Sequence, residues 1–127
     1  MKKLILLLVV LFAGLGLSAQ TNFTNSGDTI TNSGTVSATA EIKNAGGVSI
    51  QAVVTKISGT VAGTAVLQGS LDGSTYYTFA ADTLTLSDVS SQTLIWNVAE
   101  NYYVNYKVLF TGSGTMSAKA EAFYRKR

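Results

Sequence analysis

The sequence predicts an all-β protein, a single antiparallel, immunoglobulin-like β-sandwich of about seven strands. Three observations support this fold class. Short runs rich in Val, Ile, Thr and Tyr are separated about every ten residues by clusters of Gly, Ser, Asn and Asp. Several runs alternate between apolar and polar residues, as half-buried antiparallel strands do. Helical patterns are nearly absent after residue 20, so strands must pack against strands.

The N-terminal segment has the layout of a secretory signal peptide. Lys2 and Lys3 give a positive start, residues 4–17 form an apolar run, and Ser18 and Ala19 supply small residues after it. The apolar run is shorter than the roughly 20 residues that span a membrane. We therefore expect residues 1–19 to be a signal peptide cleaved after Ala19, with an uncleaved membrane anchor as the alternative.

The charge of the chain changes once this segment is removed. The chain has nine Lys and Arg residues and seven Asp and Glu residues, and two of the nine basic residues are Lys2 and Lys3. The remaining chain is neutral, which argues against nucleic acid as a partner, because that affinity rests on basic side chains neutralising phosphates.

The signal peptide, in turn, determines the expected location. Once it is cleaved, we expect no membrane association. We expect a periplasmic, cell-surface, extracellular or virion-associated location.

The rest of the chain divides into a polar segment over residues 20–34 and one β-sandwich domain over residues 35–127. The polar segment is rich in turn-forming residues, so it is either a flexible lead-in or a short edge strand. Strands of the domain are expected over residues 35–42, 48–58, 64–71, 75–79, 92–98, 103–111 and 115–124.

The first and last of these strands resemble each other. The segments "GTVSATAE" (34–41) and "GTMSAKAE" (114–121) match at six of eight positions. Either the similarity is due to chance, or both strands occupy similar environments, one at each sheet edge or paired with each other. Terminal strands of a sandwich tend to lie at edges, and there Lys119 and Glu121 would face solvent on a strand whose unpaired backbone groups accept a strand from another chain. The sequence then predicts a protein–protein interface at Lys119 and Glu121.

The stretch "LQGSLDGSTYYTF" (67–79) predicts a hairpin. Asp72 and Gly73 suit a two-residue type I′ turn, in which both central residues take positive φ. This register sets Tyr76 opposite Gly69, where the ring would cover the glycine backbone. The alternative is a calcium loop, which needs several oxygen ligands, but Asp72 is the only carboxylate in the stretch.

Catalytic equipment is sparse. The chain has neither His nor Cys, which excludes Ser-His-Asp and Cys-His arrangements, the common zinc sites and haem ligation. Carboxylates remain, so a paired-carboxylate glycosidase is formally open, although none lies in a recognisable constellation. We expect a protein that is not an enzyme and that carries no cofactor and no metal.

Aromatic residues are the remaining candidates for binding. Tyr76 and Tyr77 are adjacent, as are Tyr102 and Tyr103, so within a strand one member of each pair faces inward and the other outward. Outward tyrosines could stack on sugar rings or contact a protein. Trp96, the single tryptophan, is expected to pack in the core.

Two long stretches carry a resemblance. "VSIQAVVTKISGTVAGTAVLQGSLDGSTYYTF" and "YYVNYKVLFTGSGTMSA", within about residues 48–118, resemble small β-sandwich proteins encoded among bacteriophage and prophage structural genes. The resemblance implies a structural role. Its motifs consist of turn and strand residues, so it transfers no catalytic residue.

Two functions are therefore open. The first is a non-catalytic structural, assembly or surface-display module of phage-like origin, acting through a protein partner or self-association. The second is a secreted carbohydrate-binding module or adhesin that binds a glycan through Tyr76, Tyr77, Tyr102 and Tyr103.

Overall fold

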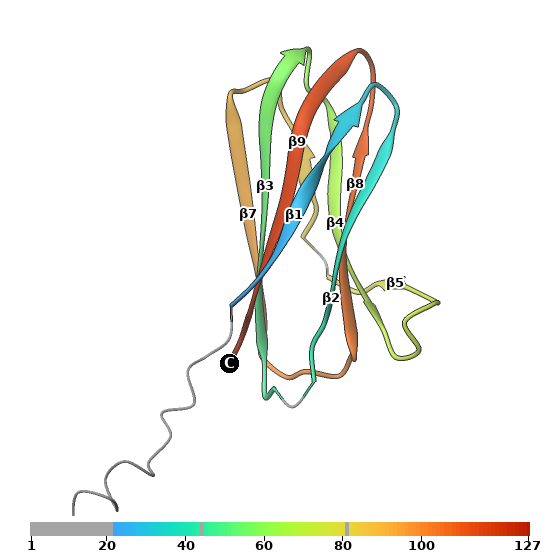
Figure 1. Ribbon diagram of the computed structural model, residues 1–127, viewed down its shortest axis with the longest axis vertical. Helices are drawn as coiled ribbons and strands as arrows, with labels where there is room; N and C mark the ends of the chain where they lie inside the picture. The colour runs from blue at the N-terminus through green and yellow to red at the C-terminus, as the bar shows by residue number, and fades with distance from the viewer. Residues whose placement is uncertain (1–21, 44, 81) are drawn as a thin grey trace, which may run out of the picture.

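The computed structural model describes the backbone of residues 22–43, 45–80 and 82–127, and their side chains from Asp28 onward (Figure 1). The expected signal peptide, residues 1–19, lies outside this range. Within the range every regular element is a β-strand. No described helix has the length and hydropathy needed to cross a membrane.

Nine antiparallel strands in the described ranges form two facing sheets. One sheet has four strands in the order β1-β9-β3-β7. The other has five, in the order β2-β8-β4-β5, with β6 also pairing with β4. The strands are β1 (Asn22–Thr31), β2 (Thr35–Glu41), β3 (Val48–Gly59), β4 (Gly63–Ser70), β5 (Tyr77–Thr78), β6 (Leu84–Leu86), β7 (Ser91–Val98), β8 (Asn105–Gly112) and β9 (Met116–Lys126).

The predicted all-β antiparallel sandwich is confirmed, and the structure adds two strands to the seven expected. The polar segment before residue 35 forms β1, which completes one edge of the four-stranded sheet. Apolar and polar residues alternate only weakly along this segment. Its pairing with β9 rests on backbone N–H and C=O groups, which do not require such alternation. The short β6 lies between the strands expected over residues 75–79 and 92–98.

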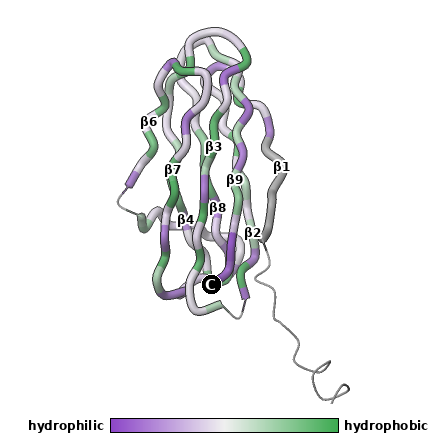
Figure 2. Tube along the Cα trace, turned by 90° about the vertical axis from the view of Figure 1, so that its left-hand side faces the viewer, coloured by the Kyte–Doolittle hydropathy of each residue, from purple (hydrophilic) through white to green (hydrophobic). Residues whose placement is uncertain are grey.

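Period-two alternation places the core between the sheets. Along β8, Tyr106, Val108 and Phe110 are fully buried, and their neighbours point outward. Figure 2 shows the same alternation of hydrophobic and hydrophilic residues along β3, β7 and β9. The inward residues of β9 include Ala118 and Ala120, whose small side chains leave room for the large rings of the opposite sheet.

The position of β9 corrects a prediction. The last strand was expected at a sheet edge, but β9 lies between β1 and β3 and pairs with both. Lys119 is in register with Thr29 on one side and Thr55 on the other. Lys119 and Glu121 therefore lie on an interior strand, where they form a 2.7 Å ion pair on the outer face. The edge was misassigned because the polar β1 was not recognised as a full strand.

Candidate functional site

The loop between β4 and β5 is longer than the predicted two-residue turn. Gln68 is in register with Thr78, and Gly69 with Tyr77, one residue further than expected. Gly73 has φ 75°, as predicted, but Asp72 does not take positive φ, since Asn32 is the non-glycine residue that does so in the described chain. The type I′ assignment is therefore wrong. Figure 1 shows this loop projecting from the side of the sandwich.

Asp72 holds the loop together through its own backbone. Its Oδ1 accepts hydrogen bonds from the N–H of Thr75 (2.7 Å), the N–H of Ser74 (2.8 Å) and the hydroxyl of Ser70 (2.9 Å). Ser70 Oγ in turn accepts from the N–H of Gly73 at 2.9 Å. These bonds, that to Thr75 above all, hold the pKa of the Asp72 carboxyl well below its usual range.

This bonding favours the turn over the calcium loop for Asp72. The carboxylate oxygen already has three donors from its own loop, which a cation would have to displace. No group of three His, Cys, Asp or Glu side chains that could hold a metal ion is found in the part of the chain that the structure describes.

The register shift also changes which ring covers Gly69. A Cβ added to Gly69 would lie 2.5 Å from Cγ of Tyr103, so it is Tyr103, rather than Tyr76, that lies against the glycine. The Tyr103 ring packs against Phe79, with centroids 4.8 Å apart, and edge-on against the buried Tyr106 at 5.9 Å. Tyr103 is thus a half-buried ring held in place on three sides.

The structure separates the four candidate tyrosines. Tyr77 and Tyr102 are 65% and 69% exposed, and they adjoin the hollows around the fixed ring of Tyr103. Tyr76 lies apart from these hollows, with Lys107 Nζ 4.0 Å from its ring centroid. Lys107 lies between the inward-facing Tyr106 and Val108 on β8, so its own side chain points outward. Tyr76 therefore lies on the outer face of the five-stranded sheet.

Three adjoining hollows run along this side of the molecule. The first, about 260 Å³, is lined by Leu71, Asp72, Thr75, Tyr77 and Tyr103. The second, about 420 Å³, shares Tyr103 and adds Phe79, Val98, Ala99, Glu100 and Tyr102. We refer to Leu71, Tyr77, Phe79, Tyr102 and Tyr103 as the aromatic surface. Sequence reasoning missed Leu71, which is 70% exposed, and Phe79, because neither belongs to a tyrosine pair.

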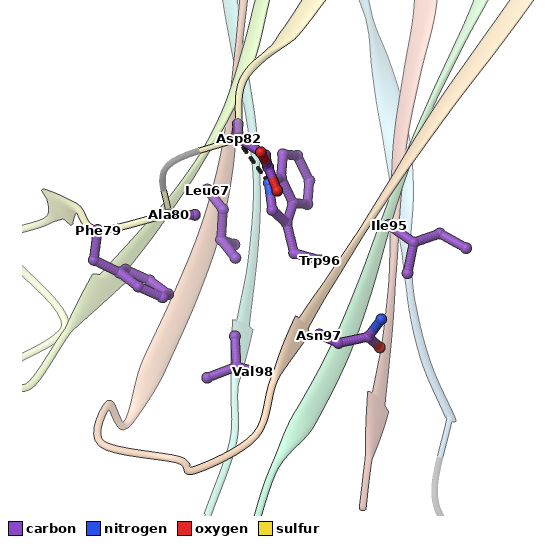
Figure 3. Close-up of a pocket in the computed structure, with 8 residues that line it drawn as sticks. All are labelled: Leu67, Phe79, Ala80, Asp82, Ile95, Trp96, Asn97 and Val98. Carbon is purple, nitrogen blue, oxygen red and sulfur yellow. Dashed lines mark hydrogen bonds between the residues drawn. The ribbon is translucent and has the colours of Figure 1, made fainter.

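The third hollow, about 510 Å³, lies beside β7 and shares Phe79 and Val98 with the second (Figure 3). Trp96 forms one wall, and its indole N–H donates to the backbone oxygen of Asp82 at 2.9 Å. Trp96 is buried, as predicted. Ile95 and Asn97 point to the opposite side of β7 from Trp96 (Figure 3).

Two carboxylates border the aromatic surface, and both already accept hydrogen bonds from the protein. Asp72 is engaged by its own loop, and Glu100 accepts a hydrogen bond from the hydroxyl of Tyr102. Carboxylates, hydroxyls and ring faces together offer hydrogen-bond acceptors beside flat apolar patches. Lys119 and Glu121 are not among the residues that line the three hollows.

No protein-family model and no curated protein sequence matches the chain. Solved structures share its fold at low identity. The Yersinia pseudotuberculosis-derived mitogen is 13% identical, with a TM-score of 0.53 and coverage of 86% of both chains. A protein of infectious bursal disease virus, Gx strain, is 15% identical, with a TM-score of 0.53 over 84% of this chain and 32% of the other.

A third similar structure contains the CBM22-1 and GH10 modules of Clostridium thermocellum endo-1,4-β-D-xylanase 10B. It is 13% identical, with a TM-score of 0.51 over 89% of this chain and 25% of the other. The chain therefore spans about a third or less of the viral and xylanase chains. These likenesses show the fold of the chain, a β-sandwich.

Proposed function

We propose that the protein is an exported, non-catalytic β-sandwich module that binds carbohydrate through the aromatic surface. The observation that carries this proposal is the arrangement of three tyrosines. Tyr77 and Tyr102 expose about two-thirds of their surface beside Tyr103, whose ring is fixed by Phe79 and Tyr106. An export signal at residues 1–19, as the sequence predicts, would bring such a module to where polysaccharides occur.

The exposure of these rings calls for a functional explanation. Other tyrosines of the chain, Tyr106 and Tyr124, are almost completely buried and satisfy their hydroxyls with protein acceptors. A clustered set of exposed large apolar side chains marks an interaction site more often than scattered single ones do. Tyrosine gives a large, rigid contact area at low entropic cost and adds a hydroxyl for hydrogen bonding.

The hollows fit a sugar better than a buried small-molecule ligand. They are open to solvent and lie side by side, so an extended chain of sugar rings could occupy them in succession. Ring faces at Tyr77, Tyr102 and Tyr103 would contact the apolar faces of the sugars. The carboxylates of Asp72 and Glu100 would accept hydrogen bonds from the sugar hydroxyl groups, and the Thr75 hydroxyl would accept or donate them.

Titration calorimetry against a panel of soluble polysaccharides tests the proposal. We expect Tyr77→Ala and Tyr102→Ala each to weaken binding by at least about tenfold. Tyr76→Ala is the matched control, since it removes a neighbouring ring of the same type that lines none of these hollows. If no polysaccharide binds, or if Tyr76→Ala weakens binding as much as Tyr77→Ala, carbohydrate recognition at this surface is refuted.

A structural or assembly module of phage-like origin is the second candidate. It is favoured by Leu71, an aliphatic side chain that is 70% exposed and offers a sugar no hydrogen bond. The unpaired edge of β7 also favours it. The edge role first assigned to Lys119 and Glu121 has no basis, because β9 is an interior strand.

A further inference from the structure

The lateral edges of the two sheets differ in how they are protected against pairing with another chain. The four-stranded sheet ends in β1 and β7, and the five-stranded sheet ends in β2 and in the short strands β5 and β6. An exposed edge presents unpaired N–H and C=O groups, and natural proteins protect edges with charges, bulges, short strands or covering segments.

Most of these edges carry such a device. The register of β1 shifts between Asn25 and Asp28, and Asp28 adds a charge. The free side of β2 lies next to β1, to which a tight turn joins it, and β2 ends in Glu41. Strands β5 and β6 are only two and three residues long. Each of these edges is a poor template for a regular ladder.

The edge at β7 carries no charge and no bulge, and the segment around β6 contacts it through two side chains, Trp96 bonding to the backbone oxygen of Asp82 and Gln92 bonding to the backbone of Ser87. Its sequence, "SQTLIWNV", contains no charged residue, no Gly and no Pro over eight residues. Its register with β3 is regular from Ser91 opposite Thr55 to Val98 opposite Val48, without a bulge. Uncharged, β-branched and aromatic segments of this length pair readily with other strands. Figure 2 views the molecule from this side.

We propose that the protein forms a symmetric dimer in which β7 of one copy pairs antiparallel with β7 of a second copy. A two-fold axis perpendicular to the sheet produces this pairing and closes the assembly at two copies. The two four-stranded sheets then join into one continuous sheet. This inference concerns the edge of β7, which borders the aromatic surface at the hollow that Phe79 and Val98 share, and it does not depend on carbohydrate binding.

The side chains of β7 favour a second copy as the occupant. Its outer-face residues, Ser91, Thr93, Ile95 and Asn97, are uncharged, so antiparallel self-pairing brings no like charges together. Ile95 is 54% exposed in the monomer, and the pairing would bury it against the partner's outer face. The partner's strand would also close the open side of the hollow beside Trp96 and Val98.

A charge placed on the edge tests the proposal with a control on the neighbouring strand. Sedimentation velocity of the purified protein from about 1 to about 500 µM is expected to show a reversible monomer–dimer equilibrium. Ile95→Lys places two positive charges near the two-fold axis and should raise the dimer Kd by at least about tenfold. Gln51→Lys adds the same charge to the same face, at the residue of β3 directly opposite Ile95, and should leave the Kd within about twofold.

Thr93→Lys is a second edge variant at an exposed position, and it should weaken the dimer as Ile95→Lys does. It keeps the test decisive if Ile95→Lys folds poorly. Hydrogen exchange of β7 amides should slow as protein concentration rises. A strict monomer throughout the range, a dimer that survives both edge variants, or equal weakening by Gln51→Lys would each overturn the proposal. Polysaccharide binding by Ile95→Lys is expected to persist, which keeps the two proposals separable.

Discussion

At the scale of single residues, the loop that carries the aromatic surface is held by one carboxylate. Asp72 Oδ1 accepts three hydrogen bonds from Ser70, Ser74 and Thr75, all within its own loop. This bonding fixes the backbone that leads from Leu71 to Tyr77. Tyr77 therefore owes its position to an acidic residue that needs no contact with a ligand.

We predict that the stability contributed by Asp72 depends on pH. Its hydrogen bonds lower the pKa in the folded state, so the contribution is present above the ordinary carboxyl pKa, about 4, and is lost as pH falls below it. At neutral pH Asp72→Ala should be less stable than wild type, and Asp72→Asn, which keeps an acceptor oxygen, should lose less. The differences should shrink below about pH 4 in urea unfolding measured over a pH series. A gap that does not change with pH would contradict this assignment.

At the scale of elements, β9 organises the four-stranded sheet. It pairs with β1 along one side and with β3 along the other, and its inward alanines allow close packing on the opposite sheet. An interior strand has no free edge to offer a partner. Three of the exposed large apolar residues lie elsewhere: Ile95 on β7, Leu71 in the loop between β4 and β5, and Tyr77 on β5.

We predict that Lys119→Pro destabilises the fold rather than altering association alone. Proline removes a backbone donor from a strand that is paired on both sides, at a cost of about 1–3 kcal/mol or more. Lys119→Ala is the control, because it removes the ion pair with Glu121 but keeps the N–H, and it should cost at most about 1 kcal/mol. Denaturant unfolding of both variants measures the difference. Equal stabilities would mean that β9 is not an interior strand.

At the scale of the whole molecule, packing and hydrogen bonds must hold two sheets together without disulfides, since the chain has no Cys. The phenol of Tyr124 on β9 spans the core and donates to the backbone oxygen of Ala38 on β2 at 2.7 Å. This bond links an interior strand of one sheet to an edge strand of the other. Burial raises the pKa of Tyr124, and to a lesser extent that of Tyr106.

We predict that Tyr124→Phe lowers the free energy of unfolding at neutral pH by about 1–3 kcal/mol, because the buried oxygen of Ala38 loses its donor. A raised folded-state pKa contributes stability that is present below the unfolded pKa, about 10, and is lost as pH rises above it. Wild type should therefore lose stability more steeply than Tyr124→Phe above about pH 10. Parallel curves in denaturant unfolding at neutral and alkaline pH would show that Tyr124 titrates normally.

The candidate site was only partly predictable from the sequence. All four paired tyrosines were named without saying which member of each pair faces outward, and the structure strongly exposes Tyr77 and Tyr102. Tyr76 was named with them, but a loop one residue longer than expected moves it beside Lys107. No sequence pattern marked Phe79 and Leu71 as site residues, because they line hollows that segments distant in the chain form together.

The sequence by itself determined the fold class, the strand faces and the burial of Trp96, because alternation and turn chemistry act over a few neighbouring residues. It also determined that Gly73 takes positive φ. Only the tertiary structure decided which strands lie at edges: β9 is an interior strand, and β7 is an edge strand without a charge or a bulge. Strand neighbours are chosen by backbone pairing between distant segments, and that choice also brings Tyr77, Tyr102 and Tyr103 to one side of the sandwich.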